Sequence, residues 1–297
     1  MILQTSLPVP LPGSAPAVVA VPAPGSGPQR WAGAPSAALD QDGSVVLAYR
    51  ERLSFGEDRL LLARSHDGEH VEVFAQLDKE RCGFAMVERP ALLRDPSGGW
   101  RLYVCGSDPA TGRWSVGLLQ ADDLAALLDA PLLEVFPADE RTTVKDPVVR
   151  FDGRHWHAWV CCHPLDDPHA EDRMSTAYAT SDDGLTWTWH GTVLAPRAGT
   201  WDARGTRLTT FLPDGRAAYD GRASAAEDWC ERTGLTGPPH AGPQLVGTGE
   251  DAVADVRYLD VLALPGGGWR LYYEAPLPDG SHELRTELIP APPERGS

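Results

Sequence analysis

The sequence predicts an all-β fold, a five-bladed β-propeller with about four antiparallel strands per blade. Two observations lead to this prediction. First, 27 prolines, 30 glycines and 10 tryptophans separate many short apolar runs, and helical periodicity is sustained only from Asp122 to Leu128. Second, one pattern of strand, turn and strand recurs five times at a near-constant spacing, which is typical of propeller blades.

Each repeat consists of an apolar strand, a tight glycine turn and a second strand that ends in an aromatic residue. The five copies occupy residues 33–49, 88–103, 145–159, 203–219 and 256–272. Equivalent anchor residues are Pro35, Pro90, Pro147, Gly205 and Tyr258, which are separated by 55, 57, 58 and 53 residues. In three repeats a third strand follows, within residues 60–73, 116–123 and 176–187, so four strands per blade fit the length of the repeat.

The repeats span almost the whole chain, which favours a single propeller domain over residues 1–297. Residues 1–30 precede the first repeat and form an N-terminal arm in this prediction. Residues 17–21 are apolar and are expected to pair with residues 282–289, so that the two ends of the chain close the ring and remove a free sheet edge.

Charge and composition exclude several classes of partner. The formal net charge is −16, which repels polyanions and argues against nucleic acid or an anionic membrane as a partner. Met1 to Pro24 carries no lysine or arginine and is broken by prolines, so it predicts neither a signal peptide nor a membrane span, and we expect a cytoplasmic protein. Five cysteines without a CxxC pair indicate buried thiols rather than a disulfide framework.

Two segments resemble a known superfamily. The opening Lys145-Asp146-Pro147 is similar to the Asp-Pro strand start of the five-bladed propeller glycoside hydrolases, a group that includes arabinanases, β-xylosidases, invertases and mannoside phosphorylases. Residues 179–187 also resemble a shortened Asp-box of sialidases, which sits on outer turns and indicates fold rather than function. The resemblance covers roughly residues 30–290 and implies a carbohydrate-active enzyme, a glycoside hydrolase acting on a small glycoside or oligosaccharide.

Residues at the start of each innermost strand cluster at one mouth of a propeller channel, and alternate residues of a strand share a side. The positions one and three residues before the anchors place charged side chains from blades two to five at this mouth. They are Arg89, Asp146, Arg204, Asp202, Arg257 and Asp255. Glycoside cleavage needs two carboxylates on either side of the bond, one acting as an acid and the other as a base or nucleophile.

The resemblance implies specific roles for two of these carboxylates. Asp146 matches the third-blade aspartate, which modulates the acid or stabilises the transition state, and Asp202 falls near the fourth-blade general acid, which is usually Glu. The first-blade aspartate, the usual base or nucleophile, is absent from the segment 31–35. Asp255 is the first choice to replace it, ahead of Glu88 and Glu51. The alternative is that these acids pair with neighbouring arginines in a polar channel.

The arginines support a second hypothesis, from a different functional class. Arg89, Arg204 and Arg257 in one funnel form a clamp for carboxylate, phosphate or sulfate. The protein would then be a non-hydrolytic propeller that binds a sugar or an anionic metabolite, or a non-hydrolytic enzyme of specialised metabolism.

Several further residues complete the predicted site. Substrate contacts are expected from Trp31, Trp201, Tyr258, Glu88 and His163. A zinc site formed by the alternating His155 and His157 with Cys161 or Cys162 is conceivable, but no carboxylate lies at ligand spacing and we predict no metal. The sequence contains no phosphate-binding loop or HExxH motif, so no cofactor is expected. Asp220 to Gly249 is rich in Gly and Pro and is predicted to form a wall or lid over the funnel.

Overall fold

The structure, a computed structural model, describes residues 9–236 and 248–291 and is almost entirely β. The α-helix in this part of the chain is α1 (Leu124–Leu127), within the predicted 122–128 segment, and a 3-10 turn, η1, spans Ala225–Glu227. Asp123 caps α1 by accepting a hydrogen bond from the Ala126 N–H at 2.8 Å. Within the described ranges, no helix is long and apolar enough to cross a membrane.

The strands form five antiparallel groups. Blade one contains β2 (Trp31–Leu39), β3 (Val45–Ser54), β4 (Glu57–Ser65) and β5 (Glu72–Gln76). Blade two contains β6 (Met86–Val87), β7 (Ala91–Arg94), β8 (Trp100–Ser107), β9 (Trp114–Ala121) and β10 (Leu133–Phe136). Blade three contains β11 (Thr142–Phe151), β12 (Trp156–Pro164), β13 (Ser175–Ser181) and β14 (Thr188–Leu194). Blade four contains β15 (Gly205–Phe211), β16 (Ala217–Arg222), β17 (Arg232–Thr236) and β18 (Thr248–Ala254). Blade five contains β19 (Arg257–Ala263), β20 (Trp269–Pro276), β21 (His282–Ile289) and β1 (Val18–Val21).

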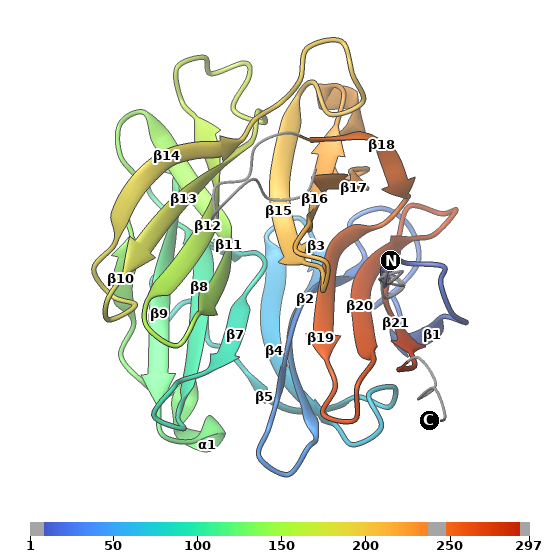
Figure 1. The fold of residues 1–297 in the computed structure, drawn as a ribbon. Coiled ribbons are helices and arrows are strands. Elements are labelled where there is room, and N and C mark those ends of the chain that lie inside the picture. The colour runs from blue at the N-terminus through green and yellow to red at the C-terminus, as the bar shows by residue number, and fades with distance from the viewer. Residues whose placement is uncertain (1–8, 237–247, 292–297) are drawn as a thin grey trace, which may run out of the picture.

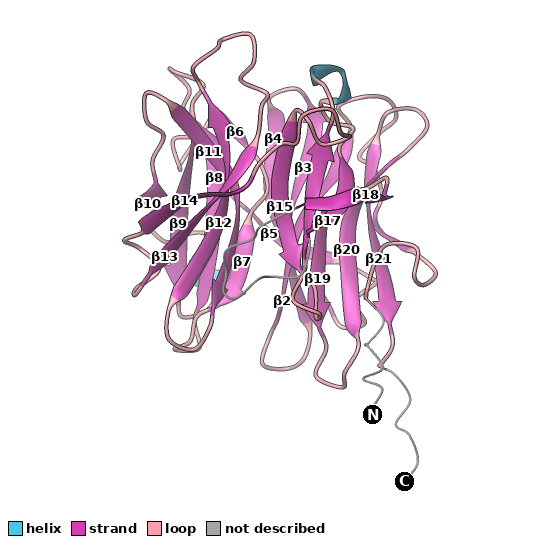
Figure 2. Cartoon of the chain, turned by 45° about the horizontal axis from the view of Figure 1, so that its top comes forward, coloured by secondary structure: helices cyan, strands magenta, loops and turns pink. Residues whose placement is uncertain are grey.

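The first strands of the five groups close into a ring. Strand β2 contacts β7, β7 contacts β11, β11 contacts β15, β15 contacts β19, and β19 contacts β2 again. Figure 1 shows these strands gathered around the middle of the molecule, and Figure 2 shows the blades from a second direction. The arrangement confirms the predicted five-bladed propeller with about four antiparallel strands per blade, and in blade two the short strands β6 and β7 pair with successive parts of β8.

Both ends of the described chain contribute to blade five. Strand β1 pairs antiparallel with β21, and a single parallel bridge between Trp31 and His282 joins blade five to blade one. Of the predicted lid, residues 220–236 form the end of β16, η1 and β17, whereas 237–247 lie outside the described residues.

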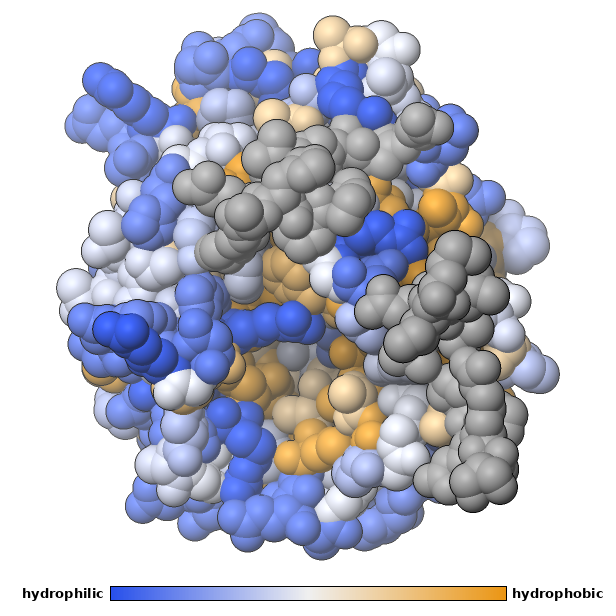
Figure 3. Space-filling view, in the orientation of Figure 1, coloured by the Kyte–Doolittle hydropathy of each residue, from blue (hydrophilic) through white to orange (hydrophobic). Residues whose placement is uncertain are grey.

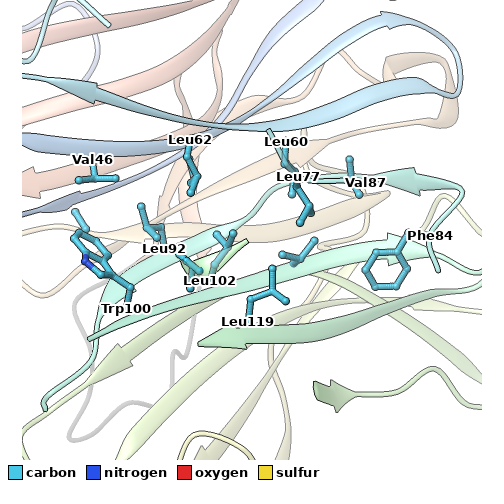
Figure 4. Packing of buried hydrophobic residues seen from close by; sticks show 14 residues of the cluster. Val46, Leu60, Leu62, Leu77, Phe84, Val87, Leu92, Trp100, Leu102 and Leu119 are labelled. Carbon is cyan, nitrogen blue, oxygen red and sulfur yellow. The ribbon is translucent and has the colours of Figure 1, made fainter. Parts of the chain in front are cut away.

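Apolar side chains fill the spaces between blades. Between blades one and two, Leu60 and Leu62 on β4 meet Leu102 on β8 and Leu119 on β9, because alternate residues of each strand face the neighbouring sheet (Figure 4). Each fully buried side chain of this size contributes on the order of 1.5–3 kcal/mol. These contacts fix the blades to one another and hold the inner strands in place around the channel.

The innermost strands carry an irregularity that determines which residues are equivalent. Ala34, Asp146 and Tyr258 adopt left-handed φ values of 51°, 51° and 53°, and the strand pairing shifts register at all three places. Tyr258 is therefore equivalent to Asp146 and Ala34, so the predicted anchor in blade five is wrong by one residue. Arg257 consequently shares its register with Lys145 rather than with Asp146.

Candidate active site

A cavity of about 680 Å³ opens at one mouth of the channel. Its walls come from the starts of the inner strands, from the second strands of blades three and four, from β9 of blade two, and from loops. The lining side chains that carry the argument below are Glu88, Lys145, His163, Arg207, Arg222, Trp229, Glu231, Arg257 and Tyr258. A pocket of this size accommodates a small organic ligand.

A buried network of ion pairs forms the base of this cavity. It contains five arginines and five carboxylates, none more than 6% exposed: Arg50, Arg52, Arg207, Arg222, Arg257, Glu88, Asp146, Asp220, Glu231 and Glu274. Burying charged groups is costly unless each is paired, and here the two signs balance in number. The network therefore holds its members in fixed positions.

Glu274 on β20 joins blades one and five in this network. Its Oε2 accepts from Arg50 at 3.0 Å, and its Oε1 accepts from Arg257 at 3.1 Å and lies 2.6 Å from Nδ1 of His282. Burial alone would raise the pKa of Glu274, but the charges of Arg257 and Arg50 outweigh burial and hold that pKa well below its usual range. Gly33 has no side chain, and the carboxylate of Glu274 fills that space. A blade-five glutamate thus lies beside the blade-one strand that lacks its own aspartate.

Glu88 and Glu231 are the two network carboxylates that line the cavity. Glu88 accepts from Arg50 at 2.5 Å and from Arg52 at 2.8 Å. Glu231 accepts from Arg222 at 2.6 Å, and its second oxygen lies 2.8 Å from Nε of Arg257 without hydrogen-bond geometry.

Both glutamates are ionised at neutral pH. Although burial acts in the opposite direction, Arg50 and Arg52 hold the pKa of Glu88 well below its usual range, and Arg257 lowers the pKa of Glu231 to about 2. Two negative oxygens from different blades therefore face one cavity.

Asp146 lies beneath the cavity and does not line it. It accepts from the backbone N–H of Arg89 at 3.2 Å and from Nη1 of Arg207 at 2.9 Å. The guanidinium of Arg207 also donates to Asp220 at 2.6 Å and to the Tyr258 hydroxyl at 2.8 Å. Asp146 thereby fixes Arg207, which does line the cavity.

Asp202 and Asp255 lie elsewhere. Asp202 is fully buried, accepts from Arg197 at 3.1 Å and from the Tyr219 hydroxyl at 2.9 Å, and does not line the cavity. Asp255 is exposed at the surface and is also absent from the cavity walls. The structure therefore does not bring these two carboxylates together with Asp146 in one site.

The other predicted substrate contacts divide in the same way. Glu88, His163, Arg257 and Tyr258 line the cavity. Trp31 is buried against His282, with ring centroids 4.9 Å apart, and Trp201 is stacked on Tyr219 at 5.5 Å; neither lines the cavity.

Two of the three clamp arginines also point elsewhere. Arg204 pairs with Asp172 at 2.9 Å, and Arg89 faces the opposite end of the channel. Of the predicted arginine triad, Arg257 alone reaches the cavity.

His163 is a neutral hydrogen-bonding group at the cavity wall. Its Nδ1 lies 2.9 Å from the backbone carbonyl of Glu171 and donates to it. Burial, together with the nearby charge of Lys145, lowers the pKa of His163 to about 3. His155 and His157 approach Asp182 and Asp152 instead, and in the described part of the chain no group of three potential metal ligands is present.

Several cavity or network residues were not predicted from the sequence. Arg50 and Arg52 alternate on β3, and Asp220 and Arg222 alternate on β16, so each pair projects to one face of its strand. Charged residues at alternate positions of an otherwise apolar strand were the available signal. Glu231 follows the 3-10 turn η1, and no pattern in the sequence distinguished it.

The cavity is close to neutral and has an aromatic rim. Six carboxylates and five cationic side chains line it: Glu88, Glu140, Glu171, Asp172, Asp228, Glu231, Arg113, Lys145, Arg207, Arg222 and Arg257. Phe55 is 68% exposed at the rim, and Trp229 is 39% exposed with a left-handed φ of 68°. The Trp229 ring lies 5.7 Å from that of the buried Trp31. A residue held in this backbone region is a common feature of functional sites.

Comparisons with known proteins identify the fold. No protein-family model and no curated protein sequence matches the chain. Solved structures do match. A β-1,2-mannobiose phosphorylase from Listeria innocua, in complex with β-1,2-mannobiose, has a TM-score of 0.64 at 13% identity over 87% of this chain and 89% of that one. The GH43_1 enzyme from Xanthomonas citri, in complex with xylotriose, has a TM-score of 0.60 at 16% identity over 92% and 90%.

A glycosyl hydrolase from Bacteroides ovatus has a TM-score of 0.61 at 14% identity over 91% of this chain and 89% of that chain. At these identities the likeness establishes a common fold. The predicted resemblance to the propeller glycoside hydrolases is confirmed at that level.

Proposed function

We propose that this protein is a carbohydrate-active enzyme, a glycoside hydrolase that cleaves a small neutral glycoside or oligosaccharide in the 680 Å³ cavity. The observation that carries the proposal is the pair of ionised glutamates, Glu88 and Glu231, that face one cavity from different blades. Anionic oxygens there stabilise the positive charge that develops on the sugar ring during glycoside cleavage. The structurally similar proteins crystallised with mannobiose and xylotriose support this class of substrate.

The cavity carboxylates differ in ion pairing, and this difference assigns them different roles. An ionised carboxylate is the form that acts as base or nucleophile, and Glu231 is in that form. A general acid must reach the leaving oxygen without first breaking an ion pair. Among the lining carboxylates, Glu140 and Glu171 make no ion pair with any described residue, and we assign the acid to one of these two.

Two aromatic side chains and the buried Asp146 complete the proposed site. Trp229 and Phe55 offer ring faces on which a sugar stacks. Asp146 is a positioning residue that acts through Arg207. The proposal places no catalytic step on Asp202 or Asp255, since neither reaches the cavity. A cytoplasmic location remains a prediction from the sequence.

The test is turnover of a panel of aryl glycosides and short oligosaccharides, with and without phosphate, by the wild type and by Glu231→Gln. We expect the variant to lose roughly 100-fold or more in kcat/KM. Glu72→Gln, on the exposed outer strand β5, is the matched control and is expected to retain full activity. Because Glu231 is buried, Glu140→Gln and Glu171→Gln, at exposed positions, provide a test that does not depend on folding.

The outcomes separate the hypotheses. Loss of turnover in Glu231→Gln and in one of the two exposed variants supports the assignment. Phosphate-dependent cleavage would keep the site but change the reaction to phosphorolysis. Full activity in all three variants would reject the assignment of these glutamates as catalytic residues. If the wild type bound sugars without cleaving them, the hypothesis that the protein is an enzyme would be rejected.

A further inference from the structure

A second cavity, of about 320 Å³, lies at the opposite end of the channel. It is lined by all five innermost strands beyond the irregularity, at residues 36–39, 89–94, 147–150, 209–210 and 260–262. Figure 3 shows a hollow near the middle of the face on which Figure 1 places β2, β7, β11, β15 and β19, with hydrophobic surface inside it and hydrophilic surface at its edge. The ring of strands thus forms a second, smaller site.

The charge of this second cavity is unlike that of the chain. Its lining contains three arginines, Arg89, Arg94 and Arg150, against a single carboxylate, Asp260. The whole chain has a formal net charge of −16. Arg94 is partly neutralised by Asp40, 3.4 Å away, whereas Arg150, among the residues that the structure describes, donates only to the backbone carbonyl of Phe211 at 3.4 Å. A positive pocket in an acidic protein favours an anion.

Arg89 is the arginine of this cavity that is buried with an incomplete set of hydrogen bonds. It is only 3% exposed, yet its Nη1 has no hydrogen-bond partner among the described residues. Its Nε donates to the Pro35 carbonyl at 3.2 Å, and its Nη2 lies 3.9 Å from Asp260, whose side chain is 16% exposed. A buried guanidinium that lacks a close carboxylate is costly unless another group satisfies it.

We propose that this second cavity binds a small oxyanion, a phosphate, a sulfate or a short carboxylate, between Arg89 and Arg150. Planar guanidinium groups match the oxygens of such ions with paired hydrogen bonds. The apolar walls formed by Val148, Val261 and Leu262 limit access of water and strengthen the charge interaction.

The site is separate from the proposed substrate cavity but linked to it. The backbone N–H of Arg89 donates to Asp146, which in turn holds Arg207 in the larger cavity. An anion that fixes Arg89 therefore stabilises the network beneath the substrate site from its other side.

Calorimetric titration with sodium phosphate, sulfate and acetate, at ionic strength held constant with chloride, tests the proposal. Arg150→Gln changes an exposed residue of the second cavity, and we expect it to weaken binding about tenfold. Asp260→Asn removes the one carboxylate of the lining and is expected to tighten binding, while its side-chain oxygen still accepts from the Ala37 N–H. Arg113→Gln, an exposed arginine of the larger cavity, is the matched control and is expected to leave the anion affinity unchanged.

Opposite responses to Arg150→Gln and Asp260→Asn would support the site. Tighter binding of phosphate than of acetate would identify the occupant as a tetrahedral ion, and the reverse would identify a carboxylate. The proposal is overturned if the wild type binds none of the three ions, or if Arg113→Gln weakens binding while Arg150→Gln does not, because the larger cavity would then be the anion site. Since no glycoside enters this experiment, its outcome is independent of the proposed enzyme activity.

Discussion

The close approach of Glu274 to Gly33 predicts a large effect from one added methyl group. In Gly33→Ala the new Cβ would come 2.5 Å from the carboxyl carbon of Glu274 and still closer to other atoms of that side chain. Glu274 is fully buried and held by Arg50, Arg257 and His282, so it cannot turn away without breaking those contacts. Overpacking costs about 1–3 kcal/mol, and disruption of a buried ion pair costs about 3–5 kcal/mol.

We therefore expect Gly33→Ala to lose about 3 kcal/mol or more of unfolding free energy, which corresponds to a fall in Tm of roughly 5–10 °C. Urea denaturation and a thermal scan measure both quantities. Gly266→Ala is the matched control, because an added Cβ there meets no atom within 4 Å. If the two variants differed by less than about 0.5 kcal/mol, the placement of Glu274 against blade one would be wrong.

Three further predictions address the site. Asp202→Asn leaves Arg197 facing a neutral group. We expect this variant to lower Tm, because it weakens a buried contact worth about 1–3 kcal/mol, and to bind sugar in calorimetry with the wild-type affinity. Loss of sugar binding would instead place Asp202 in the active site. The pKa of Glu231 lies near 2 rather than 4.5, so its stabilising effect is complete above about pH 4.5 and is lost as the pH falls toward 2. Between about pH 4.5 and 2 the unfolding free energy of Glu231→Gln, measured by denaturation, should fall by about 3 kcal/mol less than that of the wild type. An equal fall in the two proteins would contradict the ion pairs described. Trp229→Ala should weaken sugar binding about tenfold whereas Trp189→Ala, an exposed tryptophan on β14, should not, and equal effects would remove Trp229 from the substrate site.

The fold was predictable because its signals are local and repeated. The Asp-box segment illustrates this: Ser181 accepts from the Gly184 N–H at 2.8 Å, Asp183 accepts from the Leu185 N–H at 2.8 Å, and the Tyr103 hydroxyl of blade two donates to the Gly184 carbonyl at 3.0 Å. A turn that is fixed by its own side chains can be recognised from a few consecutive residues. Repetition of such turns at a near-constant spacing then specifies the number of blades.

The site was only partly predictable, because channel position depends on register within a strand. A shift of one residue reverses the side to which a side chain points. The sequence contains no sign that blade five has its left-handed residue at Tyr258, one place later than the predicted alignment required. In blade four the error is larger, since Arg207 lines the cavity and Arg204 does not. Glu88, His163 and Tyr258 line the cavity, and their predicted role in substrate binding stays a prediction.

The ion-pair network also bears on the two classes of substrate raised by the sequence. A clamp for an acidic sugar needs guanidinium groups without a carboxylate partner, but Arg222 and Arg257 already share Glu231, and Arg207 is divided between Asp146 and Asp220. An acidic ligand bound by these three arginines would have to displace the buried carboxylates or face them directly, and both cost free energy. A neutral sugar meets neither penalty, because its hydroxyl groups donate to the carboxylates and accept from the same arginines. The pairing within the network thus favours a neutral glycoside in the larger cavity, and the unpaired Arg89 at the other mouth is where an anion fits better.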